Sequence, residues 1–294
     1  MPGTTMQRVH LVDGTYELFR MFYGAPKATG PDGREVGATR ALLRSILSLL
    51  TDPEVTHVGV AFDHVIESFR NDLFDGYKTG DGVDPALMSQ FELAESAMKA
   101  LGVIAWPMVE FEADDAIASA ALAFAPEVDQ VVICSPDKDF AQCVDGFRVV
   151  IHDRRQRIIY DEDGVRQKFG VGPRSIPDYL ALVGDTADGI PGLPKWGPKA
   201  ASTLLSEYEH LEQIPDEARN WKVTVRGAEA LAQSLRESRG AALLFKTLAT
   251  LRTDAPLDVP FDELLWRGAD RATLAAFCDT IGDDSFVSRV ARFR

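Results

Sequence analysis

Residues 9–15 read VHLVDGT, a short apolar run that ends in an Asp-Gly pair. Residues 57–63 (HVGVAFD) and 131–137 (VVICSPD) are also short apolar runs that lead to an Asp, and residues 103–106 form a further apolar run. Helical patterns, with small and apolar residues at spacings of three and four, separate these runs at residues 38–50, 86–101 and 113–124. Short apolar strands that alternate with helices of this length predict an α/β fold with a mainly parallel central sheet flanked by helices.

The pattern changes after about residue 171. Residues 147–151 and 157–160 read as a closing pair of strands, and from then on helical stretches dominate. They lie at residues 176–183, 200–207, 228–235, 241–251 and 272–281. Gly and Pro crowd residues 184–198 between them. We therefore expect an α/β domain over residues 1–173 and a helical region over residues 174–294, whose tail after about residue 252 matches no pattern that we can assign.

The composition is that of a globular protein. The 294 residues include 31 Lys and Arg against 45 Asp and Glu, which gives a net charge of −14. No apolar run approaches the length of a membrane span, and residues 1–12 lack a signal-peptide pattern. The three cysteines (Cys134, Cys143 and Cys278) form no Cys-x-x-Cys pair. We expect a reduced, cytoplasmic protein with no membrane partner.

Acidic residues stand in five segments, of which four follow a predicted strand or open the next helix and the fifth, 184–189 (GDTADG), follows the helix predicted at residues 176–183. The acids are Asp13, Asp63, Glu112, Asp114, Asp115, Asp137, Asp139, Asp185 and Asp188. Any one of them alone is commonly a helix cap or a turn former. Ligands of open α/β sheets, however, bind beyond the carboxyl ends of the strands, where several of these acids are expected to meet.

Carboxylates gathered in one place need cations. Two of them about 4 Å apart repel each other by about 4 kcal/mol at an effective dielectric constant near 20. Because the candidate ligands are all oxygens, the pattern favours Mg²⁺ or Mn²⁺ over zinc. Two such ions suit in-line hydrolysis of a phosphodiester, and some of the nine acids must then act through water. The acidic net charge argues against a nucleic-acid partner only if these acids are dispersed.

Seven short motifs carry a family resemblance. In chain order they are 11–15 (LVDGT) with Arg20 downstream, 61–63 (AFD), 68–70 (SFR) through 76–78 (GYK), 112–115 (EADD), 137–139 (DKD), 184–188 (GDTAD) and 191–201 (PGLPKWGPKAA). Together they resemble the flap endonuclease and 5′-exonuclease family, which includes the 5′-nuclease domain of bacterial DNA polymerase I. No polymerase segment follows, so the chain looks like a stand-alone member.

The resemblance implies a PIN-like domain with a helical arch near residues 76–90 and a helix-hairpin-helix near residues 184–205. Asp13, Asp63, Glu112, Asp114 and Asp115 look like ligands of a first ion, and Asp137, Asp139, Asp185 and Asp188 of a second. Arg70 and Lys78 look like the catalytic cations that meet the scissile phosphate. Arg20, Lys195 and Lys199 look like DNA contacts, and hairpin carbonyls often hold K⁺.

The implied activity is that of a structure-specific 5′ nuclease, both flap endonuclease and 5′-3′ exonuclease. Its partners would be flaps, nicks and RNA primers in branched or 5′-ended duplex DNA. Primer removal and DNA repair would link it functionally to a DNA polymerase and a ligase. We expect the protein to act as a monomer.

Two departures from the family pattern stand out. Residues 79–84 (TGDGVD) are acidic where the family often carries an arginine, which would weaken or redirect threading of a single-stranded 5′ end. Lys195 replaces the first glycine of the usual Gly-x-Gly of the hairpin. We predict that Trp196, beside it, belongs to the core rather than to the DNA-facing surface.

Two other functions compete with this interpretation. A phosphatase of the haloacid dehalogenase type is suggested by residues 12–15 (VDGT), but its nucleophilic Asp would stand at position 11, which is Leu11. A DNA-structure-binding module without catalysis is disfavoured because all the acids are present.

Overall fold

The computed structural model describes residues 6–294, which form two compact units. The first unit contains residues 6–68, 80–135 and 253–294, and the second contains residues 69–79 and 136–252. Neither unit is one continuous stretch of sequence, because the chain passes between them several times. The predicted division into residues 1–173 and 174–294 stays a prediction.

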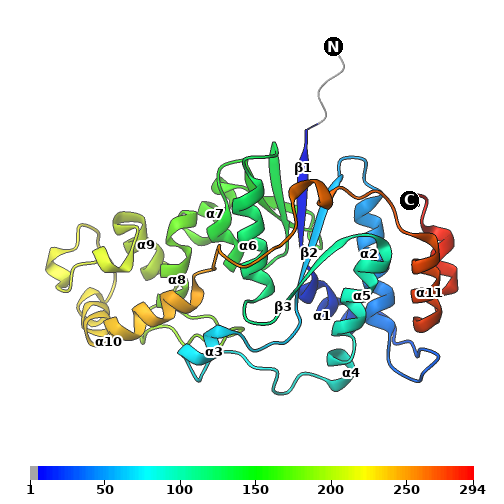
Figure 1. Cartoon of the computed structure of the whole chain (residues 1–294). Helices are drawn as coiled ribbons and strands as arrows, with labels where there is room; N and C mark the ends of the chain where they lie inside the picture. Colours follow the sequence, from blue (N-terminus) through cyan, green and yellow to red (C-terminus); the bar gives the residue numbers. More distant parts are fainter. Residues whose placement is uncertain (1–5) are drawn as a thin grey trace, which may run out of the picture. The chain divides into compact units, whose positions relative to one another are not determined.

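A parallel sheet forms the centre of the first unit (Figure 1). Its strands, in spatial order, are β3 (Ile104–Met108), β2 (His57–Asp63), β1 (Arg8–Asp13) and β4 (Gln130–Cys134). Every neighbouring pair among these four is parallel, with Asp13 opposite Ala61 and Val12 opposite Cys134. The four apolar runs were predicted as strands of a parallel sheet, and that prediction is confirmed.

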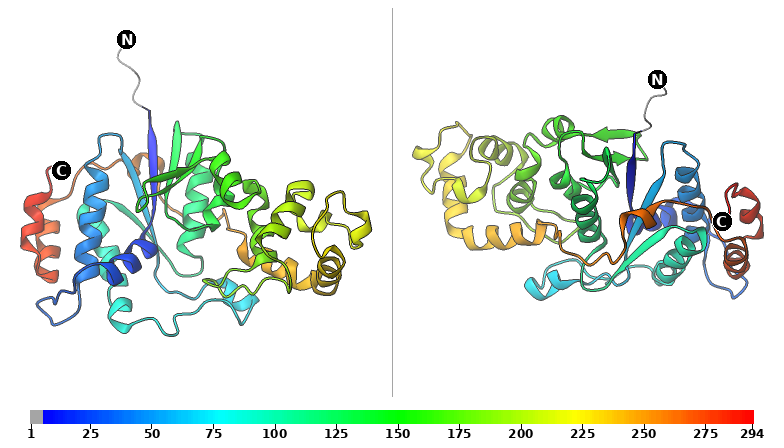
Figure 2. Two further views of the ribbon diagram at one scale, coloured as in Figure 1. Left: turned by 180° about the vertical axis from the view of Figure 1, so that it is seen from behind. Right: turned by 45° about the horizontal axis from the view of Figure 1, so that its top comes forward.

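Helices cover both faces of this sheet. On one face α6 (Ala113–Phe124) packs across all four strands, and on the other face lie α1 (Gly14–Gly24), α2 (Gly37–Leu50) and α5 (Phe91–Leu101) (Figures 1 and 2). The packing of side chains on the sheet depends on a small residue at one position. A Cβ atom at Gly59 of β2 would lie 2.3 Å from the ring of Trp106, so only glycine leaves room for that indole.

The tail of the chain completes the first unit. The 3₁₀ helix η5 (Phe261–Leu264) packs on β2, and α11 (Arg271–Ile281) packs on α5 (Figure 1). The Trp266 indole donates a hydrogen bond of 3.0 Å to the carbonyl oxygen of Leu101. In addition, the Arg40 Nε atom donates to the carbonyl oxygen of Ile281 at 2.9 Å.

The second unit is mainly helical. It contains α3 (Phe69–Leu73), η1 (Asp139–Cys143), an antiparallel pair β5 (Val149–Asp153) and β6 (Ile158–Tyr160), α7 (Glu162–Phe169), η2 (Pro173–Ser175), α8 (Ile176–Val183), α9 (Pro198–Tyr208) and α10 (Ala228–Ala249). Helix α8 packs on both α9 and α10. The two helices predicted at residues 228–235 and 241–251 are one helix, α10, with a kink at Ser238.

The segment expected to form a helical arch is mostly not helical. Within residues 76–90 the only helix is the short α4 (Pro85–Met88) (Figure 1). Asp84 caps this helix by accepting a hydrogen bond of 2.8 Å from the Ala86 amide. The helix predicted over residues 86–101 is therefore two helices, α4 and α5, separated at Ser89 and Gln90. None of the helices in residues 6–294 is long and apolar enough to cross a membrane.

Candidate active site

Asp13 lies where β1 ends and α1 begins. Its side chain is buried and caps α1 by accepting a hydrogen bond of 2.8 Å from the Tyr16 amide. The Ser135 hydroxyl donates to the other carboxylate oxygen at 2.8 Å. A short apolar strand followed directly by a helix thus fixes this carboxylate at the carboxyl edge of the sheet.

The end of β2 and the start of α6 meet at the same edge. Asp63 accepts a hydrogen bond of 2.7 Å from the Ala113 amide, which brings it beside Glu112. Asp115 accepts a bond of 3.1 Å from the Glu112 amide, and the Ser68 hydroxyl donates to Glu112 Oε1 at 2.8 Å. Asp114 lies on the same first turn of α6 and is half-buried. These acids serve as caps and turn formers, and they also gather negative charge at one edge.

The second unit contains a tighter group. Asp139, Asp185 and Asp188 each offer a carboxylate oxygen, and these three oxygens lie within 4.8 Å of one another. Asp137 is next to the group, because its Oδ1 atom accepts a hydrogen bond of 3.0 Å from the Asp139 amide. We call Asp137, Asp139, Asp185 and Asp188 the carboxylate cluster.

A close backbone approach places Lys78 against this cluster. The Lys78 amide donates a hydrogen bond of 3.1 Å to the carbonyl oxygen of Asp188. Gly189 has φ of +75°, and a Cβ atom there would lie 2.1 Å from the carbonyl oxygen of Gly76, so this position requires glycine. As a result the Lys78 ammonium lies 3.0 Å from Asp188 Oδ1.

The fold strongly perturbs one acid of the cluster, Asp139. Its side chain is only 4% exposed, and within residues 6–294 its Oδ1 atom has no hydrogen-bond partner. Burial raises the pKa of Asp139 well above its ordinary value, and the negative charges of Asp137, Asp188 and Asp185 raise it further. Lys138 opposes this shift only in part.

Lys138 lies inside the cluster. Its ammonium is 2.6 Å from Asp185 Oδ2. Burial lowers the pKa of Lys138, but the hydrogen bond to Asp185 and the charges of Asp139 and Asp137 outweigh burial, so the pKa lies above its ordinary value.

The cluster fits a divalent cation. The ammonium groups of Lys78 and Lys138 contact the cluster, and the negative charges of Asp137, Asp185 and Asp188 still raise the pKa of Asp139. Within residues 6–294, Asp139 Oδ1 is a buried carboxylate oxygen with no hydrogen-bond donor, so it is available as a ligand atom. Because all the donors are oxygens, the chemistry suits Mg²⁺ or Mn²⁺.

The predicted cations differ in their surroundings. Arg70 is only 1% exposed, and its guanidinium donates to the carbonyl oxygens of Leu248 at 2.9 Å and of Thr250 at 3.1 Å. It therefore holds the carboxyl end of α10. Arg20 pairs with Glu17 of its own helix at 2.5 Å. Lys78, by contrast, forms an ion pair with Asp188 of the carboxylate cluster. The catalytic and DNA-binding roles of all three stay predictions.

The predicted helix-hairpin-helix corresponds to α8, residues 184–197 and α9. Lys195 and Lys199 are both exposed, as contacts to a DNA backbone would require. Lys195 has φ of +74°, the left-handed conformation that glycine adopts without strain. Trp196 is 6% exposed, which confirms that it belongs to the core.

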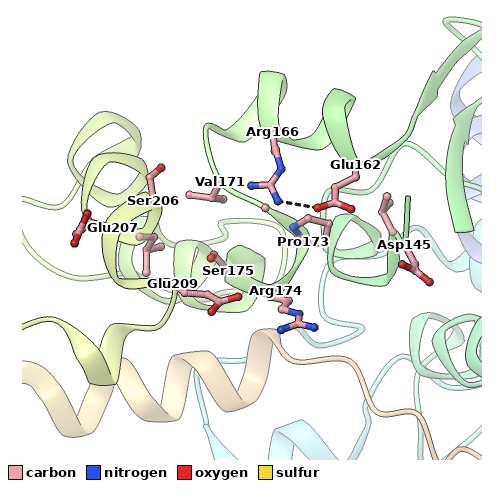
Figure 3. A pocket seen from close by; sticks show the side chains of 13 residues that line it. Asp145, Glu162, Arg166, Val171, Pro173, Arg174, Ser175, Ser206, Glu207 and Glu209 are labelled. Atoms are coloured by element: carbon pink, nitrogen blue, oxygen red, sulfur yellow. Dashed lines mark hydrogen bonds and ion pairs between the residues drawn. The ribbon is translucent and has the colours of Figure 1, made fainter. Parts of the chain in front are cut away.

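A separate cavity of about 610 Å³ lies in the second unit (Figure 3). Residues from α7, η2 and α9 line it, among them Arg166, Arg174 and Glu209, and none of the predicted site acids is among the lining residues. The Arg166 guanidinium is paired there with Glu162 at 2.7 Å. The cavity is therefore distinct from the carboxylate cluster.

The prediction from sequence did not include three residues that contact the candidate acids. Ser68 donates to Glu112, Ser135 donates to Asp13, and Lys138 pairs with Asp185. The position of Lys138 between two acids in 137–139 (DKD) was the available signal. Ser68 stands in 68–70 (SFR), one of the motifs that carry the family resemblance, whereas nothing local in the sequence singles out Ser135.

Comparison with known proteins identifies the family. A family model described as "5′-3′ exonuclease, N-terminal resolvase-like domain" matches residues 8–170, and one described as "5′-3′ exonuclease, C-terminal SAM fold" matches residues 171–272. The chain belongs to the 5′-3′ exonuclease family of nucleases, and it carries a candidate acidic metal site.

Individual relatives agree with this assignment. DNA polymerase I of Pseudomonas aeruginosa is 37% identical over 90% of this chain, which covers 29% of that protein. A 5′-3′ exonuclease of Buchnera aphidicola is 28% identical over 87% of this chain and 91% of its own length. This chain spans only 28% to 33% of the length of the DNA polymerase I relatives that it matches.

The fold also has a solved counterpart. A structure of the bacteriophage T5 flap endonuclease with DNA and metal ions is similar, with a TM-score of 0.67 at 18% identity. The similarity covers 96% of this chain and 97% of the phage chain. At this identity the likeness shows that the two proteins share a fold.

Proposed function

We propose that this protein is a metal-dependent, structure-specific 5′ nuclease that hydrolyses DNA phosphodiesters with two or more divalent ions. The observation that carries the proposal is the carboxylate cluster, in which Asp139, Asp185 and Asp188 each offer an oxygen within 4.8 Å of the others. Within residues 6–294, the buried Oδ1 atom of Asp139 has no hydrogen-bond donor. Membership of the 5′-3′ exonuclease family supports the reaction class.

The proposed ligands fall into two groups. Asp137, Asp139, Asp185 and Asp188 would hold one ion, and Asp13, Asp63, Glu112, Asp114 and Asp115 would hold another. Divalent ions, when bound, supply acidity to a water molecule and stabilise charge on the phosphate and the leaving oxygen. The phage relative whose structure contains DNA and metal ions supports a metal cofactor. The all-oxygen set of ligands is our reason for proposing Mg²⁺ or Mn²⁺.

The chain itself would bind and orient the DNA. Lys78 would contact the scissile phosphate, because its ammonium already lies at the cluster, 3.0 Å from Asp188. Lys195 and Lys199, together with the amides at the start of α9, would contact phosphates of the duplex, and Arg20 would add a further contact. Carbonyls of the hairpin would complete this grip with K⁺.

The substrate would be a 5′ flap, a nick or an RNA primer in duplex DNA. In-line attack by water would leave a 5′-phosphate on one product and a 3′-hydroxyl on the other. Primer removal and DNA repair require this reaction, and a DNA polymerase and a ligase would act on its products. We propose that a monomer suffices, because each chain carries both groups of ligands.

The test is cleavage of a labelled 5′-flap duplex by the wild-type protein with Mg²⁺ and with EDTA. We expect cleavage at the flap junction that depends on Mg²⁺ and is lost in Asp188→Asn. Asp163→Asn is the matched control, because Asp163 is an exposed acid of α7 in the same unit. If the wild-type protein binds the flap but cleaves nothing in Mg²⁺ or Mn²⁺, it is a DNA-binding module and not a nuclease.

A further inference from the structure

Lys138 occupies a position that a metal ion would also use. Its ammonium lies 2.6 Å from Asp185 Oδ2, and its side chain is 35% exposed, whereas that of Asp185 is 3% exposed. The lysine therefore reaches from the surface to a buried carboxylate of the cluster. Nothing in the proposed reaction assigns it a role.

The chain's own donors occupy both oxygens of Asp185. Oδ2 accepts from Lys138, and Oδ1 accepts a hydrogen bond of 3.0 Å from the Ala187 amide. A backbone amide carries no net charge and can share a carboxylate oxygen with an ion. An ammonium group carries a full positive charge, so it repels a divalent cation bound to the same oxygen.

We propose that Lys138 is a resident counter-ion that a divalent metal ion must displace from Asp185. The inference rests on the proposed function, because it takes the carboxylate cluster as the metal site. Without metal, Lys138 offsets part of the repulsion among Asp137, Asp139 and Asp185, which all face it. With metal, its side chain swings towards solvent, which its partial exposure permits.

This exchange has two consequences of opposite sign. Lys138 stabilises the metal-free protein, because its positive charge offsets part of the repulsion among the carboxylates of the cluster. It weakens metal binding, because the ion gains only the difference between its own interaction with Asp185 and that of the ammonium group. A lysine that merely supported the local fold would strengthen metal binding or leave it unchanged.

The test measures Mn²⁺ affinity without DNA, by electron paramagnetic resonance of free Mn²⁺ and by calorimetry, in the full chain. We expect Lys138→Met to bind Mn²⁺ about tenfold more tightly than wild type, which is the size expected for a half-exposed charged hydrogen bond. The same variant is expected to melt at a lower temperature in EDTA. Lys138→Arg keeps the charge, so its affinity should not exceed that of wild type.

Matched variants separate the possible outcomes. Lys222→Met removes another ion pair of the same unit, that of Lys222 with Glu207 at 3.1 Å, and is expected to leave Mn²⁺ affinity unchanged. Asp139→Asn should lose one Mn²⁺ site, and if it binds as the wild type does, the cluster is not the metal site and the proposed function loses its basis. If Asp139→Asn loses the site but Lys138→Met and Lys138→Gln bind Mn²⁺ no more tightly than wild type, only the displacement proposal is overturned. Damage to the fold cannot mimic the expected result, because damage weakens binding.

Discussion

A single carboxylate, Asp139, shows how the fold changes the pKa of an acid in the cluster. It is buried, one of its oxygens has no donor within residues 6–294, and three other acids raise its pKa. The folded protein therefore favours the protonated form of Asp139 more than the unfolded chain does. Stability from this group is fully present below the pKa of the unfolded chain and is lost as the pH rises through the raised pKa of the folded state.

We predict that Asp139→Asn stabilises the metal-free protein, and that it does so more strongly at higher pH. The asparagine has the same shape but carries no charge, so its benefit grows as the pH rises from the pKa of Asp139 in the unfolded chain to its raised pKa in the folded protein. Thermal melts in EDTA between about pH 5 and about pH 8 measure the difference. A melting-temperature difference that stays constant over this range would show that Asp139 is not perturbed.

The same variant has the opposite effect on function. In Mg²⁺ the wild type should gain stability through metal binding, whereas Asp139→Asn should gain much less. Cleavage by the variant should fall by about a hundredfold or more, as is usual when a group that stabilises transition-state charge is lost. Equal rates at saturating Mg²⁺ would remove Asp139 from the set of metal ligands.

In the hairpin between α8 and α9, the backbone conformation of Lys195 favours glycine, whereas its exposed charge suits a contact with DNA. Lys195 adopts φ of +74°, which costs a residue with a Cβ atom about 1–2 kcal/mol. Glycine would relieve that strain but would remove an exposed positive charge. The departure from the family's Gly-x-Gly therefore exchanges some stability for a cation next to the start of α9.

We predict that Lys195→Gly is more stable than Lys195→Ala by about 1 kcal/mol, because alanine keeps the strain and glycine does not. Both variants lose the same charge, so both should bind duplex DNA more weakly than wild type and to the same extent. Chemical denaturation and salt titrations of DNA binding measure the two effects. Equal stabilities would mean that the left-handed conformation of Lys195 is not strained.

At the level of elements, the sequence predicted best where local patterns decide the structure. The strands β1, β2 and β4 are buried apolar runs, and β3 is a partly buried apolar strand at the edge of the sheet. Short apolar runs of this kind, bounded by turn residues, are typical of strands. In the tail after residue 252 the helix at residues 272–281 was predicted and corresponds to α11, but the packing of the tail was not predicted, because it depends on partners far away in the sequence. Trp266, for example, donates to Leu101, 165 residues earlier.

In the candidate site, too, local patterns could be predicted and contacts between distant residues could not. The acids could be found because most of them come directly after a strand or open a helix, and because Asp185 and Asp188 stand in a short acidic motif directly after a helix. Their partners could not, because Ser135 meets Asp13 across 122 residues and Arg70 meets Leu248 across 178 residues. The burial of Arg70 therefore went unpredicted, although the residue itself stands in a recognisable motif.

Over the whole molecule, the acidic net charge of −14 is compatible with a DNA substrate if the charges are sorted by position. Nine of the 45 acidic residues are candidate metal ligands, so ions would neutralise part of the excess. The cations proposed to contact DNA have two different neighbourhoods. Lys78 lies at the carboxylate cluster, whereas Lys199 is exposed at the start of α9.

These neighbourhoods predict different effects of removing each charge. Lys78→Ala should lower the single-turnover rate by about 2–4 kcal/mol in transition-state stabilisation while changing duplex affinity little. Lys199→Ala should weaken binding equally for all DNA sequences and reduce the salt dependence of affinity by about one unit of slope. Once saturated with DNA, Lys199→Ala should cleave at nearly the wild-type rate.

Salt titrations of affinity, combined with single-turnover cleavage at saturating enzyme, separate binding from chemistry for each variant. Lys168→Ala is the control for both, because Lys168 is an exposed cation of α7 outside the motifs that resemble the family. Loss of chemistry in Lys199→Ala at saturation would place the hairpin in the catalytic machinery. A pure affinity defect in Lys78→Ala would mean that Lys78 contributes to DNA binding and does not stabilise the reacting phosphate. The two lysines would then share one function, and the assignment of catalysis to the cluster and of duplex binding to the hairpin would be wrong.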